Sequence, residues 1–229
     1  MMEKGSRNLT VQEEKGTSSS SLAFSIRENG DVFTDYGVRH TKEMHLIIVR
    51  DDLRYFSHLH PTRDVDGVWR TAFTPDAAGT YWLYADFIEK DGTPQTIRFE
   101  RAYEGNPGQY GLVKKEEKKK VVDGYTVELP PVATVGGNML SFVYFITDAK
   151  GNPVEVEEYL GATGHSILIS PSGDYIHAHT TESDYGDPEF LVAEPKEKFY
   201  RAFTQFQIKG KVVTVDFDWE GGHKMSDEH

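Results

Sequence analysis

Histidine spacing is the feature of this sequence most able to support chemistry. The chain has nine histidines in 229 residues, and six of them form two groups: a single histidine followed by a His-X-His pair. The six are His45, His58, His60, His165, His177 and His179. Residues i and i+2 of a strand project from the same face, about 6.5 Å apart. Imidazole binds Zn, Cu(II) and Ni, so three converging rings would suit a divalent transition metal.

A hairpin would bring each single histidine to its pair. A turn at Arg50–Leu53 separates two apolar runs, Met44–Val49 and Tyr55–His60. If the turn is centred near residue 51 or 52, His45 lies opposite or diagonal to the pair, where Cβ atoms are about 4.5–5.5 Å apart. The second group repeats this with a turn one residue shorter, at Pro171–Asp174. The sequence therefore predicts two three-histidine sites with an open fourth position.

The absence of cysteine narrows the metal chemistry. It excludes disulfides, thiolate nucleophiles and Cys-ligated zinc or iron–sulfur sites, and it favours Cu(II) or Zn over thiolate-held Cu(I). Met44 directly precedes His45 and is predicted as a soft extra ligand of the first site. His223, Met225 and His229 would bind metal only loosely, because we expect the polar tail to be frayed.

Other interpretations of the histidines stay open. Histidines at a sandwich rim can bond to loop carbonyls or stack on aromatic rings, and their recurrence would then be structural. One copy could also bind metal while the other keeps only the scaffold. An enzyme is not predicted: His177 and His179 with Glu182 match the cupin metal motif poorly, and there is no G-x-S-x-G elbow.

Short apolar runs separated by turn signals must position these histidines. Examples are Leu22–Ile26 and Tyr81–Phe87 in the first half, and Leu140–Thr147 and Tyr200–Gln207 in the second. No segment shows a 3.6-residue apolar period over three turns, and the chain is rich in Tyr, Phe and Gly. We therefore predict an all-β chain.

The two halves are repeats. His165 follows His45 by 120 residues and His177 follows His58 by 119, a period that suits a seven-stranded sandwich. We predict two tandem immunoglobulin-like β-sandwich domains. The predicted segments are a flexible lead or weak first strand at 1–21, domain 1 at 22–105, a linker at 106–120, domain 2 at 121–220 and a polar tail at 221–229. The lysine run Lys114–Lys120 is interpreted as a solvated linker.

Charge excludes two classes of partner. With 25 Lys and Arg against 37 Asp and Glu, the net charge is −12, which argues against nucleic acid and anionic membranes as partners. The acidic pairs Asp51–Asp52 and Glu157–Glu158 are interpreted as solvated turn residues. No apolar run is long enough to span a membrane, and Met1–Ser21 has no apolar signal-peptide core.

The repeat motifs resemble those of a bacterial family of exported tandem β-sandwich proteins. The matching segments are Glu43–Val49, Phe56–Pro61, Gly79–Phe87, Tyr159–His165, Tyr175–His179 and Phe206–Val215. The family is similar in layout to YtkA-like domains and is loosely associated with copper or heavy-metal handling in the cell envelope. The resemblance covers Leu22–Glu220 and implies a non-catalytic, extracytoplasmic protein. Thr180 departs from the pattern, because a proline is typical there.

Two hypotheses for function follow. The first is a non-catalytic protein that binds copper or zinc through the histidines of each repeat. The alternative is a structural or protein-interaction module of the cell envelope, whose histidines are structural and whose strand edges engage a protein partner.

Overall fold

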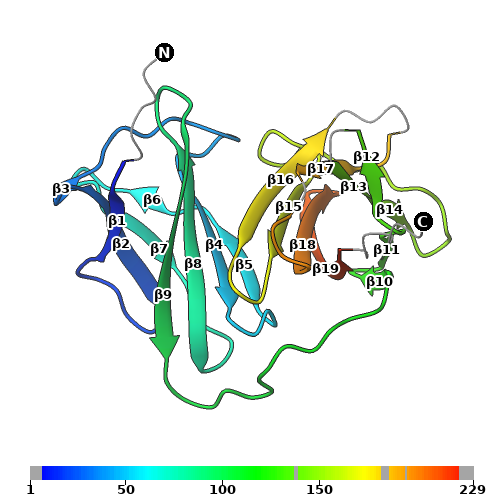
Figure 1. Ribbon diagram of the computed structural model, residues 1–229, viewed down its shortest axis with the longest axis horizontal. Helices are drawn as coiled ribbons and strands as arrows, with labels where there is room; N and C mark the ends of the chain where they lie inside the picture. Colours follow the sequence, from blue (N-terminus) through cyan, green and yellow to red (C-terminus); the bar gives the residue numbers. More distant parts are fainter. Residues whose placement is uncertain (1–6, 137–138, 182–185, 194, 222–229) are drawn as a thin grey trace, which may run out of the picture. The chain divides into compact units, whose positions relative to one another are not determined.

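In the part of the chain that the structure describes, every regular element is a β-strand (Figure 1). The computed structural model describes residues 7–136, 139–181, 186–193 and 195–221. The chain divides into two compact units, unit 1 at Met1–Gly111 and unit 2 at Leu112–His229. The prediction of an all-β chain with two tandem immunoglobulin-like sandwiches is confirmed. Within the described residues no helix has the length and apolar character needed to cross a bilayer.

Unit 1 consists of two antiparallel sheets. The first runs in the order β5-β4-β8-β9, and its strands are β4 (His45–Arg50), β5 (Phe56–Leu59), β8 (Gly79–Ile88) and β9 (Pro94–Tyr103). The second runs β1-β2-β7-β6, with β3 on β2; its strands are β1 (Leu9–Glu13), β2 (Ser21–Glu28), β3 (Asp31–Val32), β6 (Thr62–Arg63) and β7 (Trp69–Ala72).

Alternate residues of both sheets form the core of unit 1. Phe24 and Ile26 of β2 are buried in one cluster with Leu83 of β8 and Trp69 of β7. The indole Nε1 of Trp69 donates a hydrogen bond to the Tyr36 hydroxyl at 3.1 Å, which satisfies the polar end of a buried ring. One face of each sheet is thus apolar, and the other is available for different side chains.

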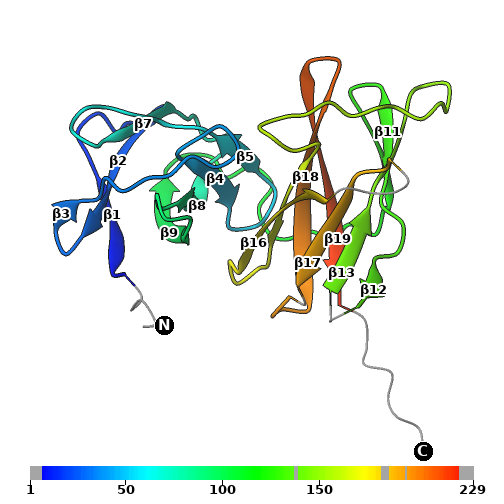
Figure 2. The same cartoon turned by 90° about the horizontal axis from the view of Figure 1, so that it is seen from above.

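Unit 2 has the same central strands in a longer sheet, ordered β12-β13-β17-β16-β15-β18-β19. Its strands are β12 (Ala133–Val135), β13 (Met139–Val143), β15 (His165–Ile169), β16 (Tyr175–Thr181), β17 (Glu189–Ala193), β18 (Phe199–Ile208) and β19 (Lys211–Glu220). A three-stranded sheet completes the unit with β10 (Lys119–Val122), β11 (Tyr125–Glu128) and β14 (Phe145–Thr147). Figure 2 shows β13 and β17 side by side, as their pairing requires.

The histidine-bearing sheets correspond strand for strand, with β5-β4-β8-β9 matching β16-β15-β18-β19. They differ in the length of the strand that carries the His-X-His pair, and one proline accounts for this difference. Pro61 has no N–H to donate, so β5 ends at Leu59 and a separate β6 follows. Thr180 replaces it in unit 2, where β16 continues to Thr181 and its last two residues pair with Phe190 and Glu189 of β17. The second hairpin is therefore longer than the first.

Two predictions of solvated charge are wrong in part. Asp52 is buried and accepts two hydrogen bonds from Arg50, at 2.9 and 3.0 Å. Lys115 and Lys120 both pair with Asp216 of β19, the latter at 2.9 Å. The partner of Asp52 lies two residues away in the chain, whereas the fold brings Asp216 to the two lysines; both partners replace water around the charge.

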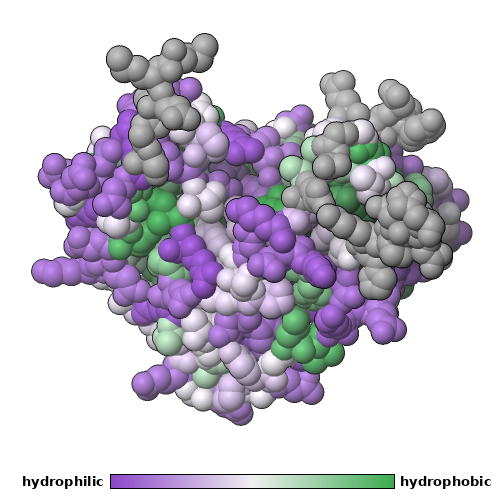
Figure 3. Space-filling view, viewed as in Figure 1, coloured by the Kyte–Doolittle hydropathy of each residue, from purple (hydrophilic) through white to green (hydrophobic). Residues whose placement is uncertain are grey.

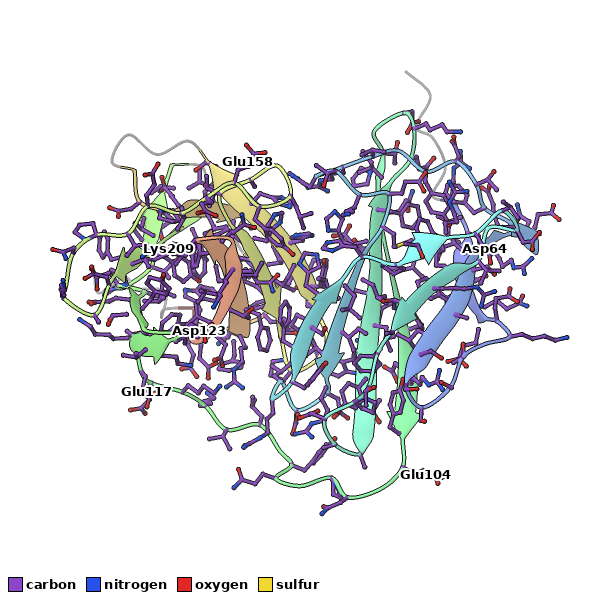
Figure 4. All side chains as sticks on the ribbon, turned by 180° about the vertical axis from the view of Figure 1, so that it is seen from behind. Asp64, Glu104, Glu117, Asp123, Glu158 and Lys209 are labelled. Atoms are coloured by element: carbon purple, nitrogen blue, oxygen red, sulfur yellow. The ribbon has the colours of Figure 1, made fainter. Side chains whose placement is uncertain are left out.

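The remaining acidic surplus lies largely at the surface. Glu104, Glu117, Asp123 and Glu158 are exposed, and Figure 4 shows them on loops and turns at the edges of their units. Figure 3 shows that hydrophilic side chains cover much of one face, with small apolar patches between them. The net charge of −12 is therefore mainly a surface property.

Candidate metal centre

The first histidine group lies across the β4–β5 hairpin of unit 1. Leu46 pairs with Leu59 and Ile47 with His58, so His45 begins β4 beside the residues that end β5. The ring centroids of His45 are 5.2 Å from His58 and 4.9 Å from His60, and those of His58 and His60 are 4.7 Å apart. The predicted hairpin and the convergence of its three rings are confirmed.

The second group repeats this arrangement across β15 and β16. His165 pairs directly with His179, and His177 lies diagonally across the ladder. The centroid of His165 lies 4.8 Å from His179 and 6.0 Å from His177, while the two β16 rings are 4.4 Å apart. The one-residue difference in turn length does not disturb the convergence.

Ligand atoms in both groups are close to coordination distance. In each group, one ring nitrogen per residue lies within 4.8 Å of the other two. Metal–nitrogen bonds of 2.0–2.1 Å in a tetrahedral site place nitrogens about 3.3 Å apart. Small side-chain rotations would therefore close either group around an ion.

A backbone carbonyl orients the first histidine of each group. His45 Nε2 donates to the Arg39 carbonyl at 3.2 Å, and His165 Nε2 donates to the Tyr159 carbonyl at 2.8 Å. A carbonyl only accepts, so each of these Nε2 atoms carries a hydrogen. The remaining nitrogen, Nδ1, then holds the lone pair; in His45 it lies 3.0 Å from His58 Nε2. Metal-binding histidines commonly have such an outer hydrogen bond.

A tight turn presents each of these carbonyls. Arg39 bridges to Lys42 in unit 1, and Tyr159 bridges to Ala162 in unit 2. The two central residues of both turns have positive φ: His40 at 49° and Thr41 at 65°, Leu160 at 54° and Gly161 at 76°. Only the second turn contains the glycine that signals this conformation, so the sequence analysis missed the matching turn in unit 1.

Met44 is not brought to the histidines. It is 1% exposed and belongs to the unit 1 core cluster together with Leu46 and Ile48. Neighbouring residues of an extended chain point to opposite faces, so a buried Met44 and an imidazole at His45 diverge. Of the other residues considered for metal binding, Glu182, His223, Met225 and His229 lie outside the described residues.

A second polar residue stands beside each group on the neighbouring strand. Asp86 of β8 pairs with His45, and Gln205 of β18 pairs with His165. Directly opposed residues of an antiparallel ladder share a face, so both side chains lie next to the histidines. Sequence reasoning did not single them out, because only the ladder register connects them to the groups.

The fold and these groups define a class of protein: two immunoglobulin-like sandwiches in tandem, each with a three-histidine group on the sheet face opposite its core. The chain belongs to the family described as a domain of unknown function (DUF8832), which matches residues 5–105 and 119–222. A comparison with curated proteins finds no significant match.

Three solved structures show a distant likeness. A two-domain fibronectin type III segment of chicken tenascin is 9% identical, with a TM-score of 0.25 over 92% of this chain and 97% of its own. A Ca²⁺-stabilised, ice-binding adhesin of an Antarctic bacterium is 10% identical (TM-score 0.26), and the bacterial integrin-binding protein invasin is 15% identical (TM-score 0.22). The match covers 93% and 92% of this chain but only 48% and 39% of those two chains. Likeness at these scores carries no inference about function.

Proposed function

We propose that each unit binds one divalent transition-metal ion, copper or zinc, and that the protein is a non-catalytic metal-binding protein. The observation that carries this is the convergence of three imidazoles within 4.8 Å in both units. Unit 1 would use His45, His58 and His60. Unit 2 would use His165, His177 and His179.

The hydrogen bonds around the first histidine support a defined donor set. With Nε2 committed to the Arg39 or Tyr159 carbonyl, His45 and His165 bind through Nδ1. His58 Nε2 donates a hydrogen bond to His45 Nδ1, with the two nitrogens 3.0 Å apart, and an ion bound between them would replace the donated hydrogen. Neutral nitrogen donors without thiolate suit Cu(II) and Zn.

The proposal also includes a non-catalytic role and a location outside the cytoplasm. Among the described residues, each converging group consists of imidazoles alone, the neutral nitrogen donors that bind Zn and Cu(II). The location outside the cytoplasm rests on the resemblance of the repeat motifs to exported tandem sandwich proteins.

Calorimetric titration of the purified chain with Zn(II) and Cu(II) tests the proposal. We expect two equivalents with Kd below about 10 μM. His58→Ala/His60→Ala should remove one equivalent and His177→Ala/His179→Ala the other. A His223→Ala/His229→Ala variant is the control for metal held by the terminal histidines, and it should retain both equivalents.

Thermal unfolding with and without metal separates binding from a structural role. An ion present at 100 times its Kd stabilises the folded state by about 2.7 kcal/mol, and the paired substitutions should abolish that shift. If binding is weaker than about 10 μM, or both equivalents survive in every variant, the histidines are structural and the proposal is wrong.

A further inference from the structure

The surroundings of the two histidine groups differ at two matching positions. The tight turn that orients the first histidine carries His40 in unit 1 and Leu160 in unit 2. The residue opposite the first histidine is Asp86 in unit 1 and Gln205 in unit 2. Both changes give unit 1 an additional metal-binding or anionic group that unit 2 lacks.

His40 lies beside the group but outside the set of converging ligand atoms, so its side chain must rotate to act as a fourth imidazole. Its ring centroid is 6.3 Å from that of His45, against 4.7–5.2 Å within the group, and the residue is half-buried. It follows Arg39, whose carbonyl already holds His45. Leu160 has nearly the same φ, 54° against 49°, so the backbone is shared and only the side chain differs.

Asp86 belongs to a polar row that crosses three strands. It pairs with His45 on one side and with Thr96 on the other, and the Thr96 hydroxyl donates to its Oδ1 at 3.5 Å. Asp86 is 5% exposed and its Oδ1 accepts the hydrogen bond from Thr96, so we assign it as a neighbour of the group rather than a ligand.

Unit 2 has the same row with a neutral residue in the middle. Gln205 pairs with His165 and Thr214, and its Nε2 donates to the Thr214 hydroxyl at 3.1 Å. The row is therefore preserved as hydrogen-bonding structure, while the charge is present in unit 1 alone. A carboxylate beside a bound cation lowers the energy of the bound state, especially where solvent is excluded.

We propose that the two sites are unequal: unit 1 holds its ion tightly in a closed four-imidazole site, and unit 2 holds its ion in an open site. This rests on the proposed function. His40 supplies the fourth ligand in unit 1, and Asp86 is a positioning residue that adds electrostatic affinity. The open position in unit 2 accepts a small exogenous ligand, such as water or an anion.

Each site is tested alone in the full chain, after the other site has been removed by its paired alanine substitutions. Azide is the probe for an open position on Cu(II), because its binding produces a charge-transfer absorption band. We expect azide to bind Cu(II) in unit 2 and to leave Cu(II) in unit 1 unchanged. The Kd of unit 1 should be lower by about tenfold or more.

Reciprocal exchanges provide the matched variants. His40→Leu should weaken unit 1 by about 10- to 100-fold and open it to azide, while Leu160→His should close unit 2. Asp86→Gln should weaken unit 1 by about tenfold and reduce the salt dependence of its Kd, without admitting azide. Asp86→Glu, which keeps the charge, should restore most of the affinity.

The possible failures are distinct. If neither site binds Cu(II) in its isolated background, the proposed function itself is wrong. If both bind with equal Kd and equal response to azide, or if the exchanges have no effect, metal binding stands and the inequality is wrong. If Asp86→Gln loses affinity but keeps the same salt dependence, Asp86 acts through hydrogen bonding and packing and not through its charge.

Discussion

Units 1 and 2 each carry three histidines at matching strand positions. However, different arginines hold the segment between β9 and β10 that connects the two units. In unit 1 the anchor is Arg50 of β4, which donates to Asp52 and to the carbonyls of Pro107 and Gln109, the latter at 3.1 Å. In unit 2 it is Arg201 of β18, which donates to Asp218 and to another carbonyl of the connecting segment. The strand that supplies the arginine has changed.

This difference distinguishes features that both histidine groups keep from features of the scaffold that vary between the units. Carbonyl, tight turn and strand register are kept around both histidine groups, whereas the buried ion pair has moved from a turn to a cross-strand position. A feature retained through this divergence is a better candidate for function than one that has been rebuilt. Substitutions made in one unit at a time test this distinction.

The largest effect is expected for the buried arginine. Arg201 is fully buried, and its bonds to Asp218 are 2.6 and 2.9 Å long. Arg201→Ala leaves the buried Asp218 carboxylate without this partner, so it should destabilise unit 2 by about 3–5 kcal/mol. Hydrogen exchange with mass spectrometry, which reports on peptides of each unit, should show the loss in unit 2, and Arg50→Ala should show it in unit 1.

Replacing both charges provides the control. Arg201→Met/Asp218→Leu should cost much less than the single substitution, because no buried charge is left unpaired. Equal losses in the single and double variants would mean that packing, rather than charge pairing, is what Arg201 contributes.

The residue before the first histidine should give the next largest effect. Met44 fills the core of unit 1, whereas Gly164 stands in its place in unit 2. A Cβ on Gly164 would lie 2.9 Å from Phe190 and 3.1 Å from Thr180, so those side chains occupy the space that Met44 fills. In unit 1 the side chain of Met44 itself fills this volume, and in unit 2 the side chains of Phe190 and Thr180 fill it.

Substitutions at the two positions should therefore destabilise their units for opposite reasons. Met44→Ala creates a cavity and should cost about 2–5 kcal/mol, while Gly164→Ala overpacks and should cost about 1–3 kcal/mol. Urea unfolding measures both. Met44→Leu conserves volume and should leave metal affinity unchanged; a tenfold loss of Cu(II) affinity would return Met44 to the ligand set.

Local patterns made much of the architecture predictable. Strand alternation, turn residues and the spacing of His58 and His60 act over a few residues, so the hairpin and the converging rings follow from sequence. The error over Met44 was avoidable, because a strand neighbour of His45 must face the other way. The burial of Asp52 was not predictable, since it depends on a distant segment whose Gly111 N–H donates to it. The position of Asp86 beside His45 was not predictable either, since only the β4–β8 register sets it.

A smaller effect is expected in the tight turns. Thr41 is β-branched and has a φ of 65°, a conformation that costs such residues energy, while unit 2 has Gly161 at 76°. Thr41→Gly should stabilise unit 1 by about 1 kcal/mol, and Gly161→Thr should destabilise unit 2 by a similar amount. Differential scanning calorimetry measures both. A destabilised Thr41→Gly variant would mean that the threonine side chain supports the turn.

The smallest expected effect is the pH dependence that Asp216 of β19 gives to the stability of unit 2. Burial alone would raise the pKa of Asp216, but its bonds to Lys115 and Lys120 hold that pKa below its usual value. The matching position of unit 1 is Arg98, which lies over the ring of Trp82. A carboxylate with a depressed folded-state pKa contributes stability that is present above its unfolded pKa of about 3.9 and lost as the pH falls through its folded value. Asp216→Asn should therefore destabilise unit 2 more at pH 6 than at pH 3 in urea unfolding, and an equal cost at both pH values would contradict the ion pairs.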